Sequence, residues 1–253
     1  MNGRSTLIAL SLFCILLLTG GSAFCQAASQ PEAARTLHIT GKGEQPNYNL
    51  RIWASGREGR VEVRNDSGSL VETLTCPLLQ GYPRVTDPEI QAVAEQFVKN
   101  FKTQDLDFDG YLDLKGPREF GASWARYCVW LFDPESHMFR SSKADSLAEQ
   151  LELLYNLEAN QKHRRIISYS IGPTYPIWDE YRVEGVGKDR PYWSRLIPVQ
   201  SCLIETPPDG KPATAVVTRY EQGDPVVGRH LLRADDKRGL PEVCGPSFAG
   251  FGQ

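Results

Sequence analysis

Residues 105–113 constrain this chain more than any other stretch, because they place four aspartates within nine positions. The segment reads Asp-Leu-Asp-Phe-Asp-Gly-Tyr-Leu-Asp, with carboxylates at relative positions 1, 3, 5 and 9 and glycine at position 6. Negative charges packed into one tight turn repel each other, and a cation would remove that repulsion. Calcium fits this pattern because it takes about six to eight oxygen ligands, which alternate aspartates around a sharp turn supply. The predicted ligands are the side chains of Asp105, Asp107, Asp109 and Asp113 and the backbone carbonyl of Tyr111.

Two other interpretations of this segment remain open. Asp and Gly are common in turns, so one alternative is a solvated acidic turn without a metal. An EF-hand needs a bidentate glutamate at position 12 of its loop, where this chain has Gly116. The residues that follow the loop are also not typical of a helix. Asp113 would therefore have to complete the calcium shell.

The N-terminus predicts export. One positive charge at Arg4 precedes an apolar run over residues 7–18, and small residues follow, which is the order of a secretory signal peptide. The run is shorter than the roughly 20 residues of a membrane span. We expect a signal peptide over residues 1–27 with cleavage near Ala27, a periplasmic or secreted protein, and no later transmembrane span. Lipid attachment at Cys25 is the less favoured alternative, because Phe24 stands where a small residue is expected.

Four cysteines remain after the signal peptide, an even number in an oxidising compartment. They are Cys76, Cys128, Cys202 and Cys244, and they predict two disulfides with three possible pairings. A Cys202–Cys244 bridge would close a loop of about 40 residues, worth about 4 kcal/mol in the chain-entropy model. A zinc site is the competing interpretation, but no histidine lies at ligand spacing from these cysteines.

Apolar periodicity predicts a mainly β chain with one or two short helices. Helical spacing follows Asp87-Pro88-Glu89 and indicates a helix ending near Asn100, with a short strand between it and the aspartate loop. Leucines at residues 147–157 suggest a second helix. An aromatic run at residues 124–132 and many further apolar runs between turn residues indicate strands of an antiparallel propeller-like, barrel or sandwich fold. We expect a flexible leader over residues 28–45 and a single β-rich domain over residues 46–253.

The aspartate loop resembles the calcium loop of integrin-alpha-type (FG-GAP-like) repeats. With the segments Val129-Trp130-Leu131-Phe132-Asp133-Pro134-Glu135 and Arg165-Ile166-Ile167-Ser168, it is similar to periplasmic proteins that carry one such loop in a β-propeller-like fold. That group includes immunity proteins that inhibit peptidoglycan-degrading effectors of type IV secretion systems. The resemblance covers residues 95–235 and implies the metal ligands of the loop. It implies no partner contacts on this chain.

A binding role is favoured over catalysis. The histidines at residues 38, 137, 163 and 230 are scattered, and the chain has no nucleophile elbow and no His-Glu-x-x-His helix. A net charge of -3 with mixed signs does not favour nucleic-acid binding. The expected function is a calcium-binding protein that binds, and inhibits, a cell-wall-degrading enzyme. The alternatives are an envelope structural or adhesion module and an unrecognised hydrolase. Candidate contacts, also explicable as strand core, are Tyr175, Trp178, Tyr192 and Trp193.

Overall fold

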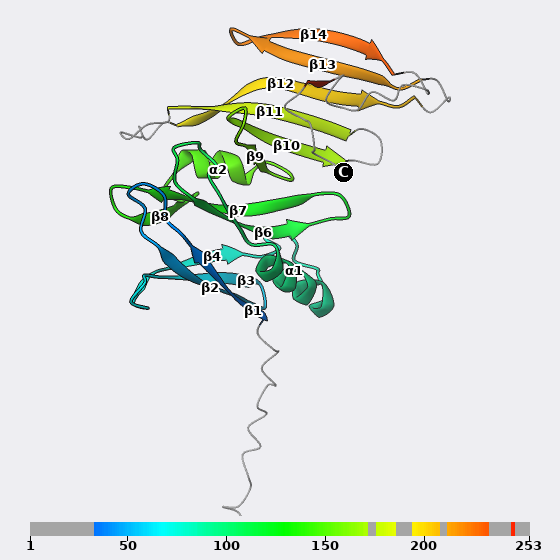
Figure 1. Cartoon of the computed structure of the whole chain (residues 1–253). Coiled ribbons are helices and arrows are strands. Elements are labelled where there is room, and N and C mark those ends of the chain that lie inside the picture. The colour runs from blue at the N-terminus through cyan, green and yellow to red at the C-terminus, as the bar shows by residue number, and fades with distance from the viewer. Residues whose placement is uncertain (1–32, 172–175, 186–193, 208–211, 233–243, 246–253) are drawn as a thin grey trace, which may run out of the picture. The chain divides into compact units, whose positions relative to one another are not determined.

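The computed structural model describes residues 33–171, 176–185, 194–207, 212–232 and 244–245. The chain divides into two units, Met1–Pro31 and Glu32–Gln253, and every described residue belongs to the second. The described residues form fourteen strands and two short helices, and the strands make three antiparallel sheets (Figure 1). The mainly β fold with two short helices is therefore confirmed.

Each sheet is a meander in which strands pair with their neighbours along the chain. The first sheet contains β1 (Ala33–Ile39), β2 (Tyr48–Ser55), β3 (Glu58–Arg64) and β4 (Leu70–Pro77). The second contains β5 (Lys102–Gln104), β6 (Asp113–Phe120), β7 (Ala125–Asp133) and β8 (Met138–Ser141). The third contains β9 (Glu158–Asn160), β10 (Arg165–Ile171), β11 (Pro176–Glu184), β12 (Arg195–Glu205), β13 (Thr214–Glu221) and β14 (Asp224–Leu231). Within the described residues the sheets are open, and none closes into a barrel.

Strand β1 corrects the expected leader over residues 28–45. Its residues pair with β2 in antiparallel register, with Leu37 opposite Leu50. Ile39 is buried in the core and Leu37 packs against it. Apolar residues at alternate positions of a strand lie on the same face, so Leu37 and Ile39 both face the core. The neighbouring residues are mostly polar, so this short apolar alternation was not recognised in the sequence.

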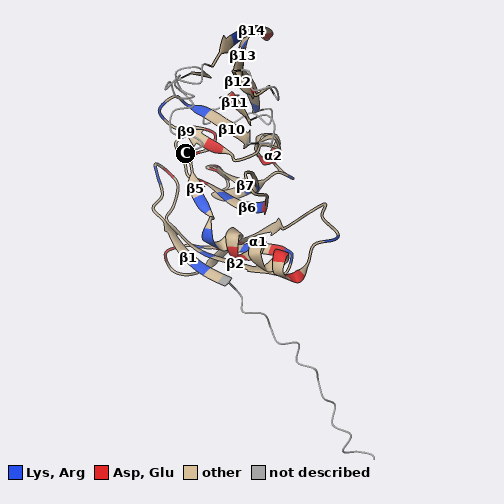
Figure 2. Ribbon diagram, turned by 90° about the vertical axis from the view of Figure 1, so that its right-hand side faces the viewer, with Lys and Arg blue, Asp and Glu red and all other residues tan. Residues whose placement is uncertain are grey.

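Helix α1 (Asp87–Lys99) begins and ends where the sequence predicts. The backbone N–H of Thr86 donates to Glu89 Oε2 at 2.7 Å, and Pro88 lies in the first turn, where its missing N–H costs nothing. Its acidic residues stand out in red in Figure 2. The buried side of the helix carries Phe97, whose ring packs on Gly59 of β3 and Gly116 of β6. A Cβ on either glycine would lie 2.6–2.7 Å from that ring, so the approach requires glycine.

Strand β7 is buried on both faces, which explains the long apolar run in its sequence. Cys128, Trp130 and Phe132 point into a first core shared with the first sheet and α1. Val129 and Leu131 point into a second core, which contains residues of helix α2 (Ser146–Glu152), β9 and β10. A strand covered on both faces has no polar side and therefore shows no alternation. Of the described helices, none has the length and apolar character needed to cross a membrane.

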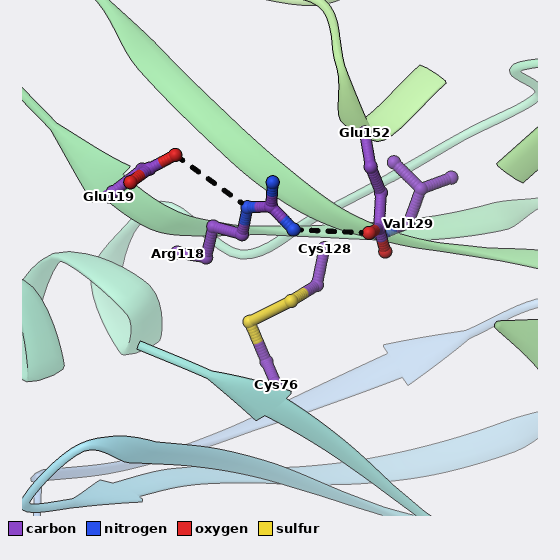
Figure 3. The surroundings of a disulfide bond; sticks show 6 residues. All are labelled: Cys76, Arg118, Glu119, Cys128, Val129 and Glu152. Atoms are coloured by element: carbon purple, nitrogen blue, oxygen red, sulfur yellow. Dashed lines mark hydrogen bonds and ion pairs between the residues drawn. A yellow bond between two sulfur atoms is a disulfide. The ribbon is translucent and has the colours of Figure 1, made fainter. Parts of the chain in front are cut away.

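Two disulfides link distant parts of the described chain. Cys76 of β4 is bonded to Cys128 of β7 and ties the first sheet to the second, while Cys202 of β12 is bonded to Cys244. The Cys202–Cys244 pairing is the bridge considered from the sequence. Figure 3 shows Arg118 next to the first disulfide, extended toward Glu119 and Glu152, with 3.2 Å from its Nη1 to Glu152 Oε2. Disulfides persist in oxidising compartments, so the protein matures in an extracytoplasmic environment.

Candidate metal centre

The aspartate loop joins β5 to β6 and contacts two cores with its apolar residues. Leu106 and Phe108 are buried in the second core, whereas Tyr111 and Leu112 pack against the first. The aspartates occupy the positions between them. Because each apolar residue is fixed in a core, the intervening carboxylates have little freedom to separate. The loop therefore holds negative charge together between two packed regions.

Three of the predicted ligands come together. One carboxylate oxygen from each of Asp105, Asp107 and Asp109 lies within 4.8 Å of the others, and Asp107 is fully buried while the other two are partly buried. Within the described residues, no other group of three or more acids, histidines or cysteines is as close. This cluster could hold a metal ion, which would offset the repulsion between the carboxylates.

Hydrogen bonds between side chains and backbone shape the turn around this cluster. Asp109 Oδ1 accepts from the N–H of Tyr111 at 2.9 Å, and Asp107 Oδ1 accepts from the N–H of Asp109 at 3.2 Å. Asp105 Oδ2 accepts from the N–H of Gly110 at 3.2 Å. Gly110 has a φ of 98°, a conformation that a side chain would resist. The turn thus directs three carboxylates toward one point.

Asp113 has a second role that the spacing did not indicate. Its side chain is fully buried, Oδ2 accepts from the N–H of Leu106 at 2.7 Å, and Oδ1 accepts from the N–H of Phe132 at 2.8 Å. It thereby fastens the start of the loop to β7, and it lies outside the group of three close carboxylates. Ligation by Asp113 and by the carbonyl of Tyr111 stays a prediction.

Two residues far away in sequence also hold the loop. Gln45 exchanges two hydrogen bonds with the backbone of Leu112, at 2.8 and 2.9 Å. Arg164 donates from Nη2 to the carbonyl of Phe108 at 2.7 Å, and its guanidinium lies 5.7 Å from the centre of the Phe108 ring. Sequence patterns gave no signal for either residue, since each contact joins segments more than 50 positions apart.

Burial and mutual repulsion raise the carboxyl pKa values in the loop. Desolvation is the main cause for Asp109, whose pKa rises to about 6, and the charge of Asp105 adds to it. Desolvation also raises the pKa of Asp105, although backbone N–H groups and the charges of Lys42 and Arg164 oppose it. The pKa of the buried Asp113 rises well above its usual value through desolvation and the charge of Asp109. Ionised carboxylates are therefore disfavoured in the absence of a cation.

The donor atoms suit a hard cation. The three close side chains offer oxygen alone, whereas zinc and copper sites favour nitrogen and sulfur. Asp105 Oδ1 is buried and accepts no hydrogen bond from the described residues. A buried oxygen without a donor is costly, and a metal ion would compensate it. The residues present therefore fit the expected oxygen-ligated ion.

Of the four predicted partner contacts, one is buried and three lie outside the described residues. Trp178 is only 4% exposed and belongs to a third core with Cys202 and Cys244, so it does not form a contact surface. It lies on β11 and belongs to the same core as residues of β10, β12 and β13. Tyr175, Tyr192 and Trp193 lie outside the described residues.

The four histidines lie in separate parts of the described chain. His38 is on β1, His137 in the turn before β8, His163 before β10 and His230 on β14.

Comparisons with known proteins find no relative. No protein-family model, no curated protein and no solved structure is significantly similar to this chain.

The raised pKa of Asp109 predicts an unusual pH dependence. Because its pKa is higher in the folded than in the unfolded chain, this group favours folding most below about pH 4 and loses that contribution as the pH rises through about 6. We expect the melting temperature of calcium-free protein to fall more between pH 5 and 7 than that of Asp109→Asn. A bound cation would keep the carboxylates ionised, and this difference should then disappear. Identical pH profiles for the two calcium-free proteins would contradict the expectation.

Proposed function

We propose that this protein is an exported calcium-binding module in which Asp105, Asp107 and Asp109 hold the ion. The cluster of three carboxylates carries the proposal, supported by the buried Oδ1 of Asp105 and the oxygen-only donor set. Calcium supplies positive charge and tolerates irregular oxygen coordination, whereas Mg²⁺ requires near-octahedral geometry and retains several waters. The carbonyl of Tyr111 and the carboxylate of Asp113 would complete the shell.

The ion's role would be to fix the junction between the first and second cores. Leu106 and Phe108 pack on one side of the loop, and Tyr111 and Leu112 on the other. Extracellular calcium modules bind with a Kd of about 10⁻⁴ to 10⁻³ M, which keeps such a site occupied outside the cytoplasm. The proposed calcium is therefore a permanent structural component rather than a signal.

The proposed compartment follows from the two disulfides and the N-terminal sequence. The disulfides indicate an oxidising environment. Residues 1–27 have the sequence order of a signal peptide, so we assign the mature protein to the periplasm or to secretion.

The proposed activity is binding to a partner protein, with inhibition of a peptidoglycan-degrading enzyme as its specific form. The single aspartate loop in a mainly β chain supports this assignment through its resemblance to single-loop periplasmic proteins, a group that includes immunity proteins. The competing role is an envelope structural module in which calcium serves stability alone, and the position of the loop between two cores is compatible with it.

A turbidity assay separates the two roles. Purified protein in calcium is added in excess to lytic enzymes from competing bacteria, and clearing of a peptidoglycan suspension is followed. We expect slower clearing with at least one enzyme, and recovery of clearing when the added protein is heat-denatured first. Unchanged clearing across a panel of lytic enzymes, with calcium binding intact by titration calorimetry, would reject inhibition and favour the structural role.

A further inference from the structure

Two adjoining cavities lie over the third sheet, close to the aspartate loop. The larger has a volume of about 750 Å³ and the smaller about 440 Å³. Both are lined by Arg165, Arg182 and Glu184, so the two cavities adjoin at these side chains. We call the pair of cavities the arginine groove. Its size lies in the range of binding sites for small ligands and peptide side chains.

Arginines outnumber acids among the described residues that line the arginine groove. Its four arginines are Arg164, Arg165, Arg182 and Arg195. Among the described lining residues, the acids are Glu184 and, from the aspartate loop, Asp107. Glu184 is shared, at 3.5 Å from Arg182 and 2.9 Å from Arg195. One carboxylate between two guanidiniums leaves an excess of positive charge.

The two arginines around Glu184 are accessible to a ligand. The side chains of Arg182 and Arg195 are 54% and 60% exposed, and Arg165, which pairs with Glu180 at 3.1 Å, is 32% exposed. Blue basic residues are visible near β10 in Figure 2. Exposed ion pairs of this kind contribute little to stability, so they can exchange partners at low cost.

The surroundings of these arginines favour a peptide as the ligand. A guanidinium presents planar pairs of N–H donors that match a carboxylate. Next to the arginines the groove is lined by Ile197, Pro198, Val199 and Tyr220, which offer apolar contact to side-chain stems. Arginine and tyrosine beside apolar surface are typical of protein interfaces. Lysine is absent from the described lining of both cavities.

The aspartate loop forms one end of the groove. Asp107 and Phe108 line the smaller cavity together with Arg164, and Arg164 donates to the carbonyl of Phe108 at 2.7 Å. Without a cation, the loop carboxylates repel an anionic ligand at this end. A bound calcium ion offsets two negative charges and removes much of that repulsion.

We infer that the arginine groove binds an acidic peptide segment of a partner protein, and that calcium in the aspartate loop strengthens this binding. The calcium dependence rests on the proposed function, whereas the groove rests on its own residues. The ligand contributes Asp or Glu side chains to Arg182 and Arg195 and apolar atoms to the surface around Tyr220.

The test uses a fluorescent glutamate-rich peptide and protein purified with both disulfides formed. Binding is measured by fluorescence anisotropy at low ionic strength, in calcium and in chelator. We expect Arg182→Gln/Arg195→Gln to weaken binding about tenfold, because it removes the two exposed carboxylate partners. Glu184→Gln should strengthen binding, since it removes a competing carboxylate. Chelator should weaken binding severalfold in the wild type.

The matched control is Arg60→Gln/Arg64→Gln, which removes two exposed, glutamate-paired arginines from β3. This control should bind the peptide like the wild type. An equal loss of peptide affinity in both double variants would overturn the proposal that the arginine groove binds an acidic peptide. The absence of any peptide binding by the wild type would overturn it as well. Equally tight, arginine-dependent binding of a thymidine oligonucleotide would overturn the peptide assignment in favour of a general polyanion site.

The outcomes also separate the groove from the proposed metal site. Peptide binding that requires Arg182 and Arg195 but is the same with and without calcium would support binding in the arginine groove. It would overturn the inference that calcium in the aspartate loop strengthens this binding. A calcium-dependent rise in melting temperature without peptide binding would support the metal site and overturn the groove.

Discussion

Replacing Asp107 and Asp109 with asparagine should abolish the stabilisation that calcium gives to the wild-type protein. Asparagine keeps the Oδ1 acceptors that bind the N–H groups of Asp109 and Tyr111, so the turn is preserved while two charges are lost. In about 10 mM calcium, a Kd of 10⁻⁴ to 10⁻³ M stabilises the wild type by about 1.4 to 2.7 kcal/mol. This corresponds to a rise of about 3 to 10 °C in Tm for a domain of this size.

In calcium-free protein, the same two substitutions should not lower the stability. There the wild type confines close carboxylates whose pKa values are raised by burial, and the asparagine variant removes part of that cost. We expect Asp107→Asn/Asp109→Asn to be at least as stable as the wild type in chelator and insensitive to calcium. Differential scanning calorimetry in calcium and in chelator measures both effects.

A matched control distinguishes the loop from general charge effects. Glu135→Gln/Asp224→Asn also removes two negative charges, from exposed positions outside the loop. It should retain the full response to calcium. If calcium raised the Tm of Asp107→Asn/Asp109→Asn as much as that of the wild type, the ion would bind elsewhere.

Replacing Cys76 and Cys128 with alanine should lower the free energy of unfolding by about 4 kcal/mol. The two cysteines are 52 residues apart, and the chain-entropy model assigns a value of this size to a loop of that length. Both are buried in the first core, so the substitution also removes packed sulfur atoms. The effect is large compared with the total stability of a typical domain, which is about 5 to 15 kcal/mol.

Urea unfolding followed by circular dichroism measures this loss. The free energy extrapolated to water is the quantity to compare, because removing a disulfide also changes the unfolded state and hence the slope. Wild-type protein kept oxidised is the reference, and the Cys202→Ala/Cys244→Ala variant tests the second bridge separately. A Cys76→Ala/Cys128→Ala variant within about 0.5 kcal/mol of the wild type would contradict the assigned role of the bridge.

Local patterns predicted much of the secondary structure. The helix at Asp87–Lys99 was predictable because its start signals, its apolar face and its end agree. The strand β7 was recognised from its aromatic run, and the two cores on its faces explain that run. The order of the three sheets was not predictable, since it depends on contacts between segments that show no shared pattern.

Only the part of the candidate metal site that is local in sequence was predicted. Asp105, Asp107 and Asp109 are close in sequence, and a tight turn brings them together in space. The structural role of Asp113 depends on Phe132, and the support from Gln45 and Arg164 depends on the packing of distant strands. For Trp178 the structure supports strand core rather than partner contact, and the sequence left both open because an aromatic residue next to turn residues has the same local pattern in either role.

Growing crystals in millimolar calcium tests the main claim most directly. We expect an ion with oxygens of Asp105, Asp107 and Asp109 at about 2.3 to 2.6 Å, together with an anomalous signal that identifies calcium. Water alone between these carboxylates, or side chains turned away from one another at saturating calcium, would contradict it.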